Sequence, residues 1–272
     1  MQRYGIRLIG LATLLALSPA TGSAQHAHDV TLHVNPRWDE CSFQLDPALT
    51  QGAWRQFTKE AGVVTHFRPL RGARPLGVGS FEVSILQTTT GIDDHDAAWN
   101  DTFVHPDSTH WLFEGSGLPI PGLMARVGVT GQLDVGAYFT QNPNANYGFW
   151  GGQAQYNVLD EATSPVSVSA RVSLVSMFGP EDLDFTTYGT DVVASRDFRV
   201  HSTWLSITPY VGVTGSVARA HEKTGLVALR DENVAGVQAM FGAVAQIAAA
   251  RVAFEYDAAA VRSHSIRIGV AF

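Results

Sequence analysis

Apolar and polar residues alternate with a period of two from Gly77 to the C-terminus, as they do in β-strands whose two faces meet different surroundings. The final segment shows the alternation most clearly, with apolar side chains at Ile266, Ile268, Val270 and Phe272. Turn residues divide the region into about ten such segments: 77–90, 118–130, 132–141, 146–158, 165–178, 188–197, 202–220, 233–248, 250–259 and 263–272. The pattern predicts an all-β fold for residues 77–272.

The polar face of these segments distinguishes a membrane barrel from a soluble sandwich. It consists of Gly, Ser and isolated charges, and the chain has only two lysines, Lys59 and Lys223. Charged residues make up 16% of the chain, whereas soluble domains carry about 25%. Apolar side chains toward lipid and small or polar ones toward a lumen are typical of transmembrane barrels. Because hydrocarbon cannot satisfy an open sheet edge, we predict a closed antiparallel up-and-down β-barrel of about ten strands, with about eight or twelve as alternatives.

The predicted connections alternate in length along the chain. The longer ones are 91–117, 142–145, 179–187, 221–232 and 260–262, and the shorter ones centre on Gly131, 160–164, Val200 and Ala249. Barrels of the bacterial outer membrane have short periplasmic turns, longer outer loops and an even number of strands. The pattern therefore predicts a multi-pass protein of the bacterial outer membrane with both termini in the periplasm.

Residues 1–76 do not follow the strand pattern. Arg3 and Arg7 precede a short apolar stretch and small residues up to Ala24 follow it, so residues 1–24 are predicted to be a signal peptide. The stretch is too short to span a bilayer as a helix. Residues 25–76 are predicted to form a periplasmic segment, and the single cysteine, Cys41, excludes an internal disulfide.

An amphipathic helix is predicted at 46–61 within this segment. Asp46 is an N-cap candidate, Pro47 fits the first helical position, and Gly62 is a natural stop. Apolar residues fall on one face of this helix, among them Leu49, Trp54 and Phe57. The helix is too short to cross a membrane, so it either caps the periplasmic mouth of the barrel or plugs its lumen, and a packed cap is the simpler interpretation.

The C-terminal sequence from Ser265 to Phe272 resembles the terminal strand signal of bacterial outer-membrane β-barrel proteins, which is an alternating strand that ends in an aromatic residue. Gly269 lies nearer the end than the corresponding glycine of many members. The segments 128–136 and 209–213 also resemble strands of this class, so the resemblance covers residues 77–272. It implies that the protein is embedded in the lipid bilayer, and that the outer-membrane assembly machinery reads Ile266, Ile268, Val270 and Phe272.

The alternation places a set of charged residues on the inward face of the predicted barrel: Glu82, Arg126, Asp134, Arg171, Arg251, Glu255, Asp257 and Arg267. Four bases face four acids, so the predicted lumen is electrically balanced. A hairpin centred near 260–261 would set Glu255 opposite Arg267, and the turn at Gly131 would set Arg126 opposite or diagonal to Asp134. Inward glycines leave room and large inward side chains fill it, so a narrow, mostly occluded passage is expected.

A balanced, narrow lumen favours a passive channel or a binding barrel for small solutes, without catalysis and without a cofactor. A structural or surface-interaction barrel without transport is the alternative. The chain is acidic, with a formal net charge of −7, and has no basic stripe, which argues against nucleic-acid binding.

The long first loop supports a third hypothesis. Its sequence includes Asp93, Asp94, His95 and Asp96. Carboxylates beside a histidine can hold Ca²⁺ or activate water. A rim-located hydrolase or a metal-binding loop is therefore the third possibility, although a solvated acidic loop is the simpler interpretation of these residues.

Overall fold

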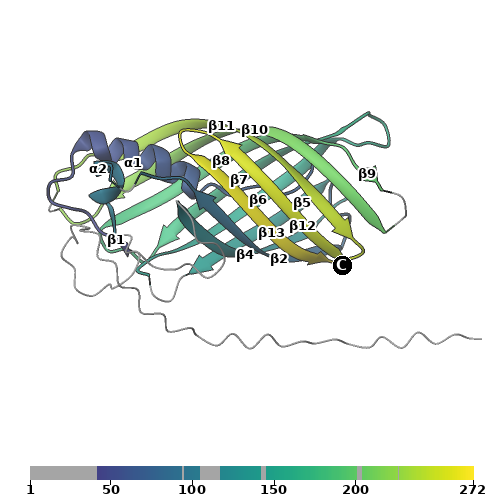
Figure 1. The fold of residues 1–272 in the computed structure, drawn as a ribbon, viewed down its shortest axis with the longest axis horizontal. Coiled ribbons are helices and arrows are strands. Elements are labelled where there is room, and N and C mark those ends of the chain that lie inside the picture. Colours follow the sequence, from purple (N-terminus) through teal and green to yellow (C-terminus); the bar gives the residue numbers. More distant parts are fainter. Residues whose placement is uncertain (1–41, 94, 105–116, 142–144, 201–203, 226) are drawn as a thin grey trace, which may run out of the picture.

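The computed structural model describes residues 42–93, 95–104, 117–141, 145–200, 204–225 and 227–272 (Figure 1). The predicted signal peptide, Cys41 and Asp94 lie outside the described residues. The described part of the chain forms a β-barrel with a small helical module at one end (Figure 1).

Antiparallel strands close the barrel, and each is hydrogen-bonded to the next around the ring. In chain order the strands are β2 (Phe81–Thr90), β4 (Leu118–Gly128), β5 (Leu133–Gln141), β6 (Gly148–Leu159), β7 (Ser167–Phe178), β8 (Leu183–Ser195), β10 (Leu205–Glu222), β11 (Glu232–Ile247), β12 (Ala250–Ala258) and β13 (Arg262–Ala271). The pairing of β13 with β2 and of β10 with β11 completes the ring. The predicted closed up-and-down barrel is confirmed, with ten strands.

The strand boundaries differ from the prediction mainly in β8, which begins at Leu183 rather than at 188. A short strand, β9 (Phe198–Arg199), pairs with the start of β10. Strands β10 and β11 contain 18 and 16 residues, and they reach the end of the barrel opposite the C-terminus together with β8, whose Leu183 is opposite Glu222 (Figure 1). This long hairpin therefore provides a wall on which further structure can pack.

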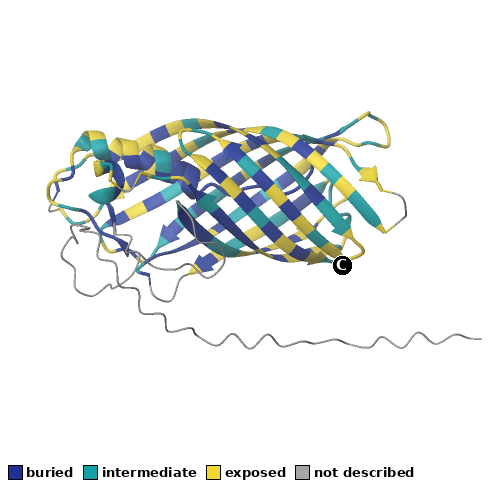
Figure 2. Ribbon diagram, viewed as in Figure 1, coloured by how far each residue is buried: buried dark blue, intermediate teal, exposed yellow. Residues whose placement is uncertain are grey.

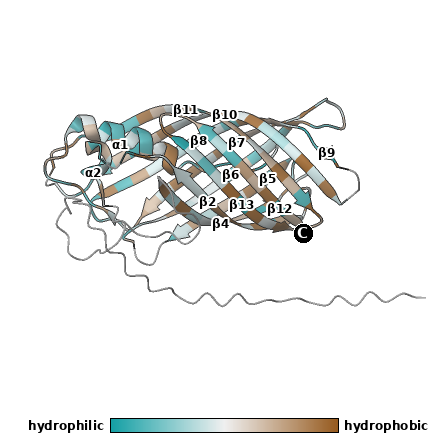
Figure 3. Cartoon of the chain, viewed as in Figure 1, coloured by the Kyte–Doolittle hydropathy of each residue, from teal (hydrophilic) through white to brown (hydrophobic). Residues whose placement is uncertain are grey.

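Side chains alternate between the two faces of the barrel, and this alternation gives the chequered pattern of buried and exposed positions in Figure 2. Outward positions are apolar, with exposed fractions of 48–59% at Val83, Leu123, Trp150 and Val211. Inward positions are rich in buried Ser, Thr, Gln and charged side chains. Figure 3 shows the same alternation as hydrophobic and hydrophilic bands along the strands. The barrel is therefore apolar outside and polar inside.

A small module closes the end of the barrel opposite the C-terminus. It consists of α1 (Gln51–Val64), α2 (Ala97–Asn100) and a two-stranded sheet of β1 (Ser42–Phe43) with β3 (Phe103–Val104). α1 packs on the long β10–β11 hairpin, where Arg55 Nη1 lies 2.7 Å from Glu232 Oε2. No helix in the part of the chain that the structure describes is long and apolar enough to cross a membrane.

The helix begins later than the sequence predicts. Its N-cap is Thr50, whose side chain accepts a hydrogen bond from the Ala53 N–H at 3.2 Å. Asp46 instead closes a turn ahead of the helix, because its carboxylate accepts from the Ala48 N–H at 2.6 Å. Both residue types can satisfy backbone donors in this way, so the sequence alone does not decide which of them starts the helix.

The helix also ends later than predicted, and Gly62 lies inside it. α1 continues to Val64, and the backbone N–H of Thr65 caps it by donating to the Ala61 carbonyl at 2.9 Å. A Cβ at Gly62 would lie 2.7 Å from the Cβ of Ala218 on β10. The glycine therefore permits close approach of the helix to the barrel wall and does not act as a stop.

The prediction that residues 25–76 and the C-terminus share one end of the barrel is wrong for the described residues. α1 covers the mouth that carries the long first connection, whereas Phe272 stacks on Phe81 at the opposite mouth, with ring centroids 4.9 Å apart (Figure 1). Residues 65–76 join the two ends through the barrel interior. Amphipathicity reveals the face that a helix buries, but it carries no information about which end of a barrel that face covers.

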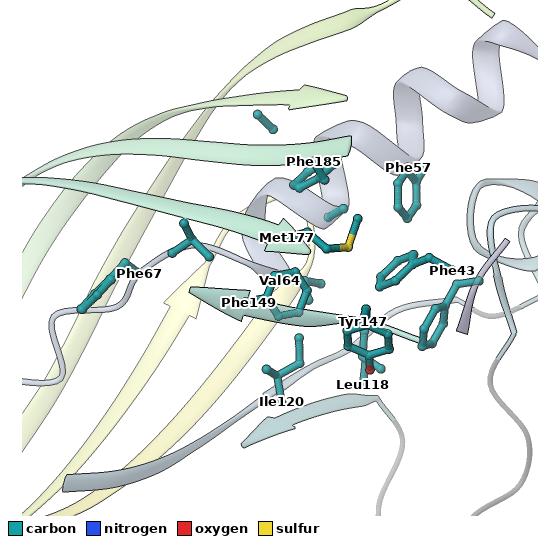
Figure 4. Packing of buried hydrophobic residues seen from close by; sticks show 14 of the residues in the cluster. Phe43, Phe57, Val64, Phe67, Leu118, Ile120, Tyr147, Phe149, Met177 and Phe185 are labelled. Atoms are coloured by element: carbon teal, nitrogen blue, oxygen red, sulfur yellow. The ribbon is translucent and has the colours of Figure 1, made fainter. Parts of the chain in front are cut away.

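An aromatic cluster fills the mouth beneath α1 (Figure 4). Phe57 stacks on Trp54 with centroids 5.5 Å apart and meets the Trp99 ring edge-on at 5.1 Å. Phe43 joins Phe57 at 5.9 Å and Tyr147 at 4.8 Å. The residues predicted to form the cap are all buried: Leu49, Trp54 and Phe57. Aromatic packing thus holds α1 in the mouth.

Replacing Phe57 by Ala should loosen α1 and leave the barrel folded. Removal of a buried Phe side chain costs about 3–5 kcal/mol, and this cost falls on the helix that Phe57 anchors. Hydrogen exchange of the α1 amides is expected to accelerate by about 100-fold or more, because local opening becomes easier. The matched control is Phe254→Ala, since Phe254 is 51% exposed on the outer face. Acceleration of equal size in both variants would contradict the anchoring role.

Candidate functional site: a plug inside the barrel lumen

Residues 65–76, which we call the plug, run through the barrel from the mouth under α1 to the mouth beside the C-terminus. At the first end the Thr65 and Thr187 hydroxyl oxygens lie 2.7 Å apart. At the second end the Leu76 N–H donates to the Asp134 carboxylate at 3.0 Å. Residues 65–73 are all buried. A turn at Gly77, whose φ of 96° is left-handed, then leads the chain into β2.

The plug has no regular secondary structure, so barrel side chains replace the hydrogen-bond partners of a helix or sheet. The Leu70 N–H donates to the Glu255 carboxylate at 3.1 Å, and the Ala73 N–H donates to the Ser195 hydroxyl at 2.8 Å. Pro69 has no N–H and needs no acceptor at that position. Buried backbone groups require such partners, and the inner wall supplies them.

Leu70 is held from both sides. Its carbonyl accepts from Arg267 Nε at 3.1 Å, and the Pro69 carbonyl beside it accepts from Arg126. Leu70 has a left-handed φ of 47°, which is uncommon for a residue with a branched side chain. Such a conformation persists where the surroundings over-determine it, and here the wall fixes both the N–H and the carbonyl.

Arginines at three-residue spacing carry the charge of the plug. Their ion pairs with the wall are Arg68–Asp257 at 3.0 Å, Arg71–Asp134 at 3.4 Å and Arg74–Asp197. Arg74 lies at the mouth, where its hydrogen bond to Asp197 raises the pKa of Arg74 above its ordinary value. A buried charge without a partner is strongly destabilising, so the buried Arg68 and Arg71 depend on their wall acids, whereas Arg74 is 52% exposed.

Asp191 of β8 is the centre of a second buried group. Its carboxylate lies 2.8 Å from Arg171 Nη2 and 3.3 Å from His66 Nε2 of the plug. The Thr214 hydroxyl donates to the same carboxylate. The Arg171 guanidinium lies over the Phe67 ring, 5.6 Å from its centroid. Wall and plug are therefore joined at this level by the His66–Asp191 hydrogen bond and the Arg171–Phe67 cation–π contact, and the Arg171–Asp191 ion pair lies within the wall.

Glu82 of β2 is the partner of two wall arginines. Arg251 Nη1 lies 2.5 Å from one carboxylate oxygen, and Arg267 pairs with the other. The Glu82 and Arg267 side chains are both at most 1% exposed. One carboxylate therefore compensates two guanidinium groups, which leaves this end of the lumen with an excess of positive charge.

The structure places all the predicted inward charges on the inner face of the barrel, but one predicted pair is wrong. In the β12–β13 hairpin Glu255 is opposite Ser265, and Arg267 is opposite Ala253. The hairpin is centred on residue 260, and a shift of the centre by about one residue moves each partner by about two. Glu255 instead accepts from the plug and from the Tyr210 hydroxyl at 2.8 Å.

Arg126 and Asp134 adopt the diagonal arrangement that the sequence left open. Arg126 is opposite Gly136, and Gly128 is opposite Asp134. The two side chains turn to different parts of the plug, since Arg126 donates to the Pro69 carbonyl and Asp134 accepts from the Leu76 N–H. Both residues thus bind the plug rather than each other.

Asp191, Arg68 and Arg71 were not among the residues predicted from the sequence. With Asp191 and the buried Glu232 of β11 included, the strands hold six inward acids and four inward arginines, so the wall is not balanced by itself. The plug provides the missing positive charge. Asp191 occupies an inward position of β8, the segment with the weakest alternation. For Arg68 and Arg71, the available sequence signal was the Arg-x-x-Arg-x-x-Arg spacing of the plug.

The room left by inward glycines is taken by the plug. A Cβ at Gly189 would lie 2.5 Å from His66 Cε1, and one at Gly151 would lie 3.2 Å from Phe67 Cδ2. The cavity beside His66 and Tyr138 measures about 20 Å³, which is room for about one water molecule. A larger cavity of about 400 Å³ lies at the mouth beside the C-terminus.

The acidic tract of the first loop is used for local hydrogen bonds. Asp93 accepts from the His95 N–H at 3.1 Å, and Asp96 caps α2 by accepting from the Ala98 N–H at 2.9 Å. Among the residues that the structure describes, no group of three or more His, Cys, Asp or Glu could hold a metal ion. Asp94 is not described, and the hypotheses of Ca²⁺ binding and of rim hydrolysis stay predictions.

The outer surface decides the class of fold. Apolar side chains face outward along the barrel strands, the charged network lies inside, and the ring is closed by β13–β2 pairing. A closed sheet with an apolar exterior and a polar interior satisfies every backbone group without water on its outside. The chain folds as an outer-membrane-type β-barrel. The predicted resemblance is confirmed at the level of the fold.

Comparisons with known proteins give low similarities. No protein family and no curated protein sequence matches the chain. The attachment invasion locus protein Ail of Yersinia pestis is 13% identical, with 72% of this chain and 99% of Ail covered and a TM-score of 0.30. Neisserial surface protein A is 14% identical over 71% of this chain and 94% of its own, with a TM-score of 0.31. The β domain of the Bordetella autotransporter BrkA is 12% identical, with 72% of this chain and 99% of that domain covered and a TM-score of 0.38. Likenesses at this level carry no argument about function, which rests on the geometry.

The residues that resemble an assembly signal lie on the last strand of the ring. Ile268, Val270 and Phe272 are 51%, 42% and 65% exposed on the outer face. Phe272 also fixes the closure of the barrel, because its backbone exchanges hydrogen bonds with Phe81 at 2.9 and 3.0 Å. Recognition of these residues by an assembly machinery stays a prediction.

Replacing Asp191 by Leu should destabilise the barrel strongly. The substitution leaves Arg171 buried without its carboxylate, which costs about 3–5 kcal/mol. The double variant Asp191→Leu/Arg171→Met should recover most of this loss, because both charges are then absent. Thermal unfolding in detergent measures both effects.

The matched control is Asp184→Asn on the same strand. Asp184 is 64% exposed and pairs with Lys223 at 3.1 Å. A surface pair of this kind contributes about 0–1 kcal/mol, so the midpoint should hardly move. A double variant no more stable than Asp191→Leu would show that packing, rather than the ion pair, is responsible.

Proposed function

We propose that the protein is a multi-pass barrel of the bacterial outer membrane that is closed at rest by its own plug, and that it binds small solutes at its mouth instead of conducting them passively. The observation that carries the proposal is the occupied lumen, in which residues 65–73 are buried against the wall. A binding role is supported by the cavity of about 400 Å³ at the mouth beside the C-terminus, a volume in the range of small-molecule sites.

The membrane location is supported by the outer face. Its exposed apolar side chains include aromatic residues near the strand ends, among them Phe81, Phe139 and Phe272, as in the aromatic girdles of membrane barrels. The bilayer is then the main partner of this surface. With long loops outward, α1 covers the outer mouth and the C-terminus lies on the periplasmic side, where the terminal strand is available to the assembly machinery.

Spontaneous opening is expected to be rare. Departure of the plug would break the Arg68–Asp257 and Arg71–Asp134 pairs and the contact between His66 and Asp191. Loss of one partner of a buried pair costs about 3–5 kcal/mol, and each 1.4 kcal/mol is about a factor of ten in population. Water that enters the lumen offsets part of this cost. The net free energy still favours the closed state, by several factors of ten in population.

Two other functions remain as alternatives. A narrow passive channel requires the plug to move aside, and a structural or surface-interaction barrel requires no solute site at all. The module of α1, α2 and the β1–β3 sheet gives the second alternative an ordered surface at one mouth. The absence of enzymatic activity and of a cofactor is a prediction, and a hydrolase at the rim is the least supported of the alternatives because Asp93 and Asp96 serve as turn and cap acceptors.

Conductance in planar bilayers tests the closure. The wild-type protein should be silent at moderate voltage, whereas Arg68→Gln/Arg71→Gln should give discrete steps, because the plug then lacks its two buried guanidinium groups. Mild urea should open the wild-type protein in the same way without any substitution.

A disulfide lock provides the control. The Thr65 and Thr187 hydroxyls are 2.7 Å apart, so cysteines at both positions should bridge in a Cys41→Ser background. The plug is then tied at one end by the bridge and at the other by its continuation into β2. Urea should open the locked protein only after reduction. Steady conductance from the oxidised lock would overturn the closed-barrel proposal.

A further inference from the structure

The cavity at the mouth beside the C-terminus is lined by an unusual number of arginines. It measures about 400 Å³. Its guanidinium groups come from the plug, from β9 and from the last two strands: Arg71, Arg74, Arg199, Arg251 and Arg267. Since the chain as a whole is acidic, this concentration of positive charge is a local property of the mouth.

The carboxylates around the cavity do not compensate all of these charges. Arg71 pairs with Asp134 and Arg74 pairs with Asp197. Glu82 alone serves both Arg251 and Arg267. Arg199 has no carboxylate partner among the described residues, and its side chain is exposed. Among the described residues that line the cavity, five are arginines and one, Asp197, is an acid. Asp134, Glu82 and Glu161, which accepts from the Asp197 N–H at 3.0 Å, lie behind this lining, so positive charge predominates at the cavity surface.

Two of the arginines also present hydrogen-bond donors that nothing in the described chain accepts. Arg267 Nη2 and Arg251 Nε are buried and have no acceptor. The Arg267 side chain is 0% exposed, and its other donors are held by Glu82 and by the Leu70 carbonyl. A buried donor left unsatisfied costs about 1–3 kcal/mol. The buried Arg267 guanidinium is therefore fixed behind the cavity, where its donors are only partly satisfied.

The cavity is open to small solutes and has an apolar side. Arg74 is 52% exposed along its side chain and Trp204 is 59% exposed, so the mouth is in contact with solvent. Trp204 and Val244 contribute apolar side chains to the lining. The volume exceeds that of a bare inorganic anion, so the cavity has room for an organic group beside the anionic one.

We propose that this cavity binds the phosphate monoester group of a small organic molecule. The arginine-rich lining suits a doubly charged anion, because guanidinium groups recognise phosphate through paired, charge-assisted hydrogen bonds. The apolar wall with Trp204 takes the organic part. This inference deepens the proposed function by naming the class of solute. Bilayer conductance tests closure and the titration below tests the site, so either proposal can fail alone.

The probes are phenyl phosphate, phenyl sulfate and a short-chain phosphatidic acid, titrated calorimetrically into the purified protein in uncharged detergent. Phenyl phosphate should saturate one site per chain. Phenyl sulfate has the same shape and a single charge, so it should bind about tenfold more weakly or less. Saturation by phenyl phosphate assigns the site to a soluble ester, whereas saturation by the phosphatidic acid alone assigns the same chemistry to a lipid headgroup.

Arginine variants locate the site. Arg199→Gln removes an exposed, unpaired charge and should not affect folding, yet it should weaken phenyl phosphate binding by about tenfold. Arg251→Gln should weaken it further, and its thermal midpoint reports whether it is folded. The matched control is Arg219→Gln, because Arg219 is a 59% exposed arginine at the other end of β10. Its affinity should equal that of the wild-type protein.

Three results would overturn the assignment. The first is the absence of saturable binding of every probe at millimolar concentration. The second is equal affinity for phenyl phosphate and phenyl sulfate, since a dianion site must distinguish them. The third is an equal loss of affinity in Arg199→Gln and Arg219→Gln, which would indicate a diffuse electrostatic effect in place of a cavity.

Discussion

The pairing of plug arginines with wall carboxylates is the interaction on which the rest of this structure depends. A closed ring with an apolar exterior confines its inward charges to a narrow space, where an unpaired charge is strongly destabilising. Arg68 and Arg71 meet Asp257 and Asp134 there. Without the plug, the wall would hold more acids than arginines. The barrel wall and the segment before it therefore form one electrostatic unit, and neither is complete alone.

The same constraint explains the fine structure of the lumen. The plug lacks secondary structure, so wall side chains bind its backbone, as Glu255 and Arg267 bind the two sides of Leu70. Gly189 leaves the space that His66 fills. At the outer end of this path, α1 is held by aromatic packing around Phe57, which needs no charge. A polar network inside the ring and an apolar cluster at one mouth thus hold the segment in two different ways.

At the mouth beside the C-terminus, carboxylates no longer pair with every arginine. Glu82 serves both Arg251 and Arg267, and Arg199 makes no ion pair in the described chain. Deeper in the lumen, Arg68 of the plug has its own carboxylate, Asp257. A barrel that is closed along its length and has a charged, solvent-filled recess at one end suits reversible binding better than free passage. The closed lumen and the basic recess are thus two outcomes of one distribution of charge.

The sequence by itself determines the barrel, because a period of two with an apolar face is a local property of each strand, and it recurs from Val83 to Val270. It also identifies eight of the wall charges that face inward, although not Asp191. It does not determine where Glu255 and Arg267 find partners, since a shift of about one residue in a hairpin changes every opposite pair. The path of residues 65–76 was decided only by the tertiary structure. Apart from the three-residue spacing of its arginines, this segment follows neither a strand nor a helix period. Its hydrogen-bond partners lie up to 197 positions away in the chain, as for Arg267 and Leu70, so no local pattern could reveal that its polar groups are satisfied in the lumen.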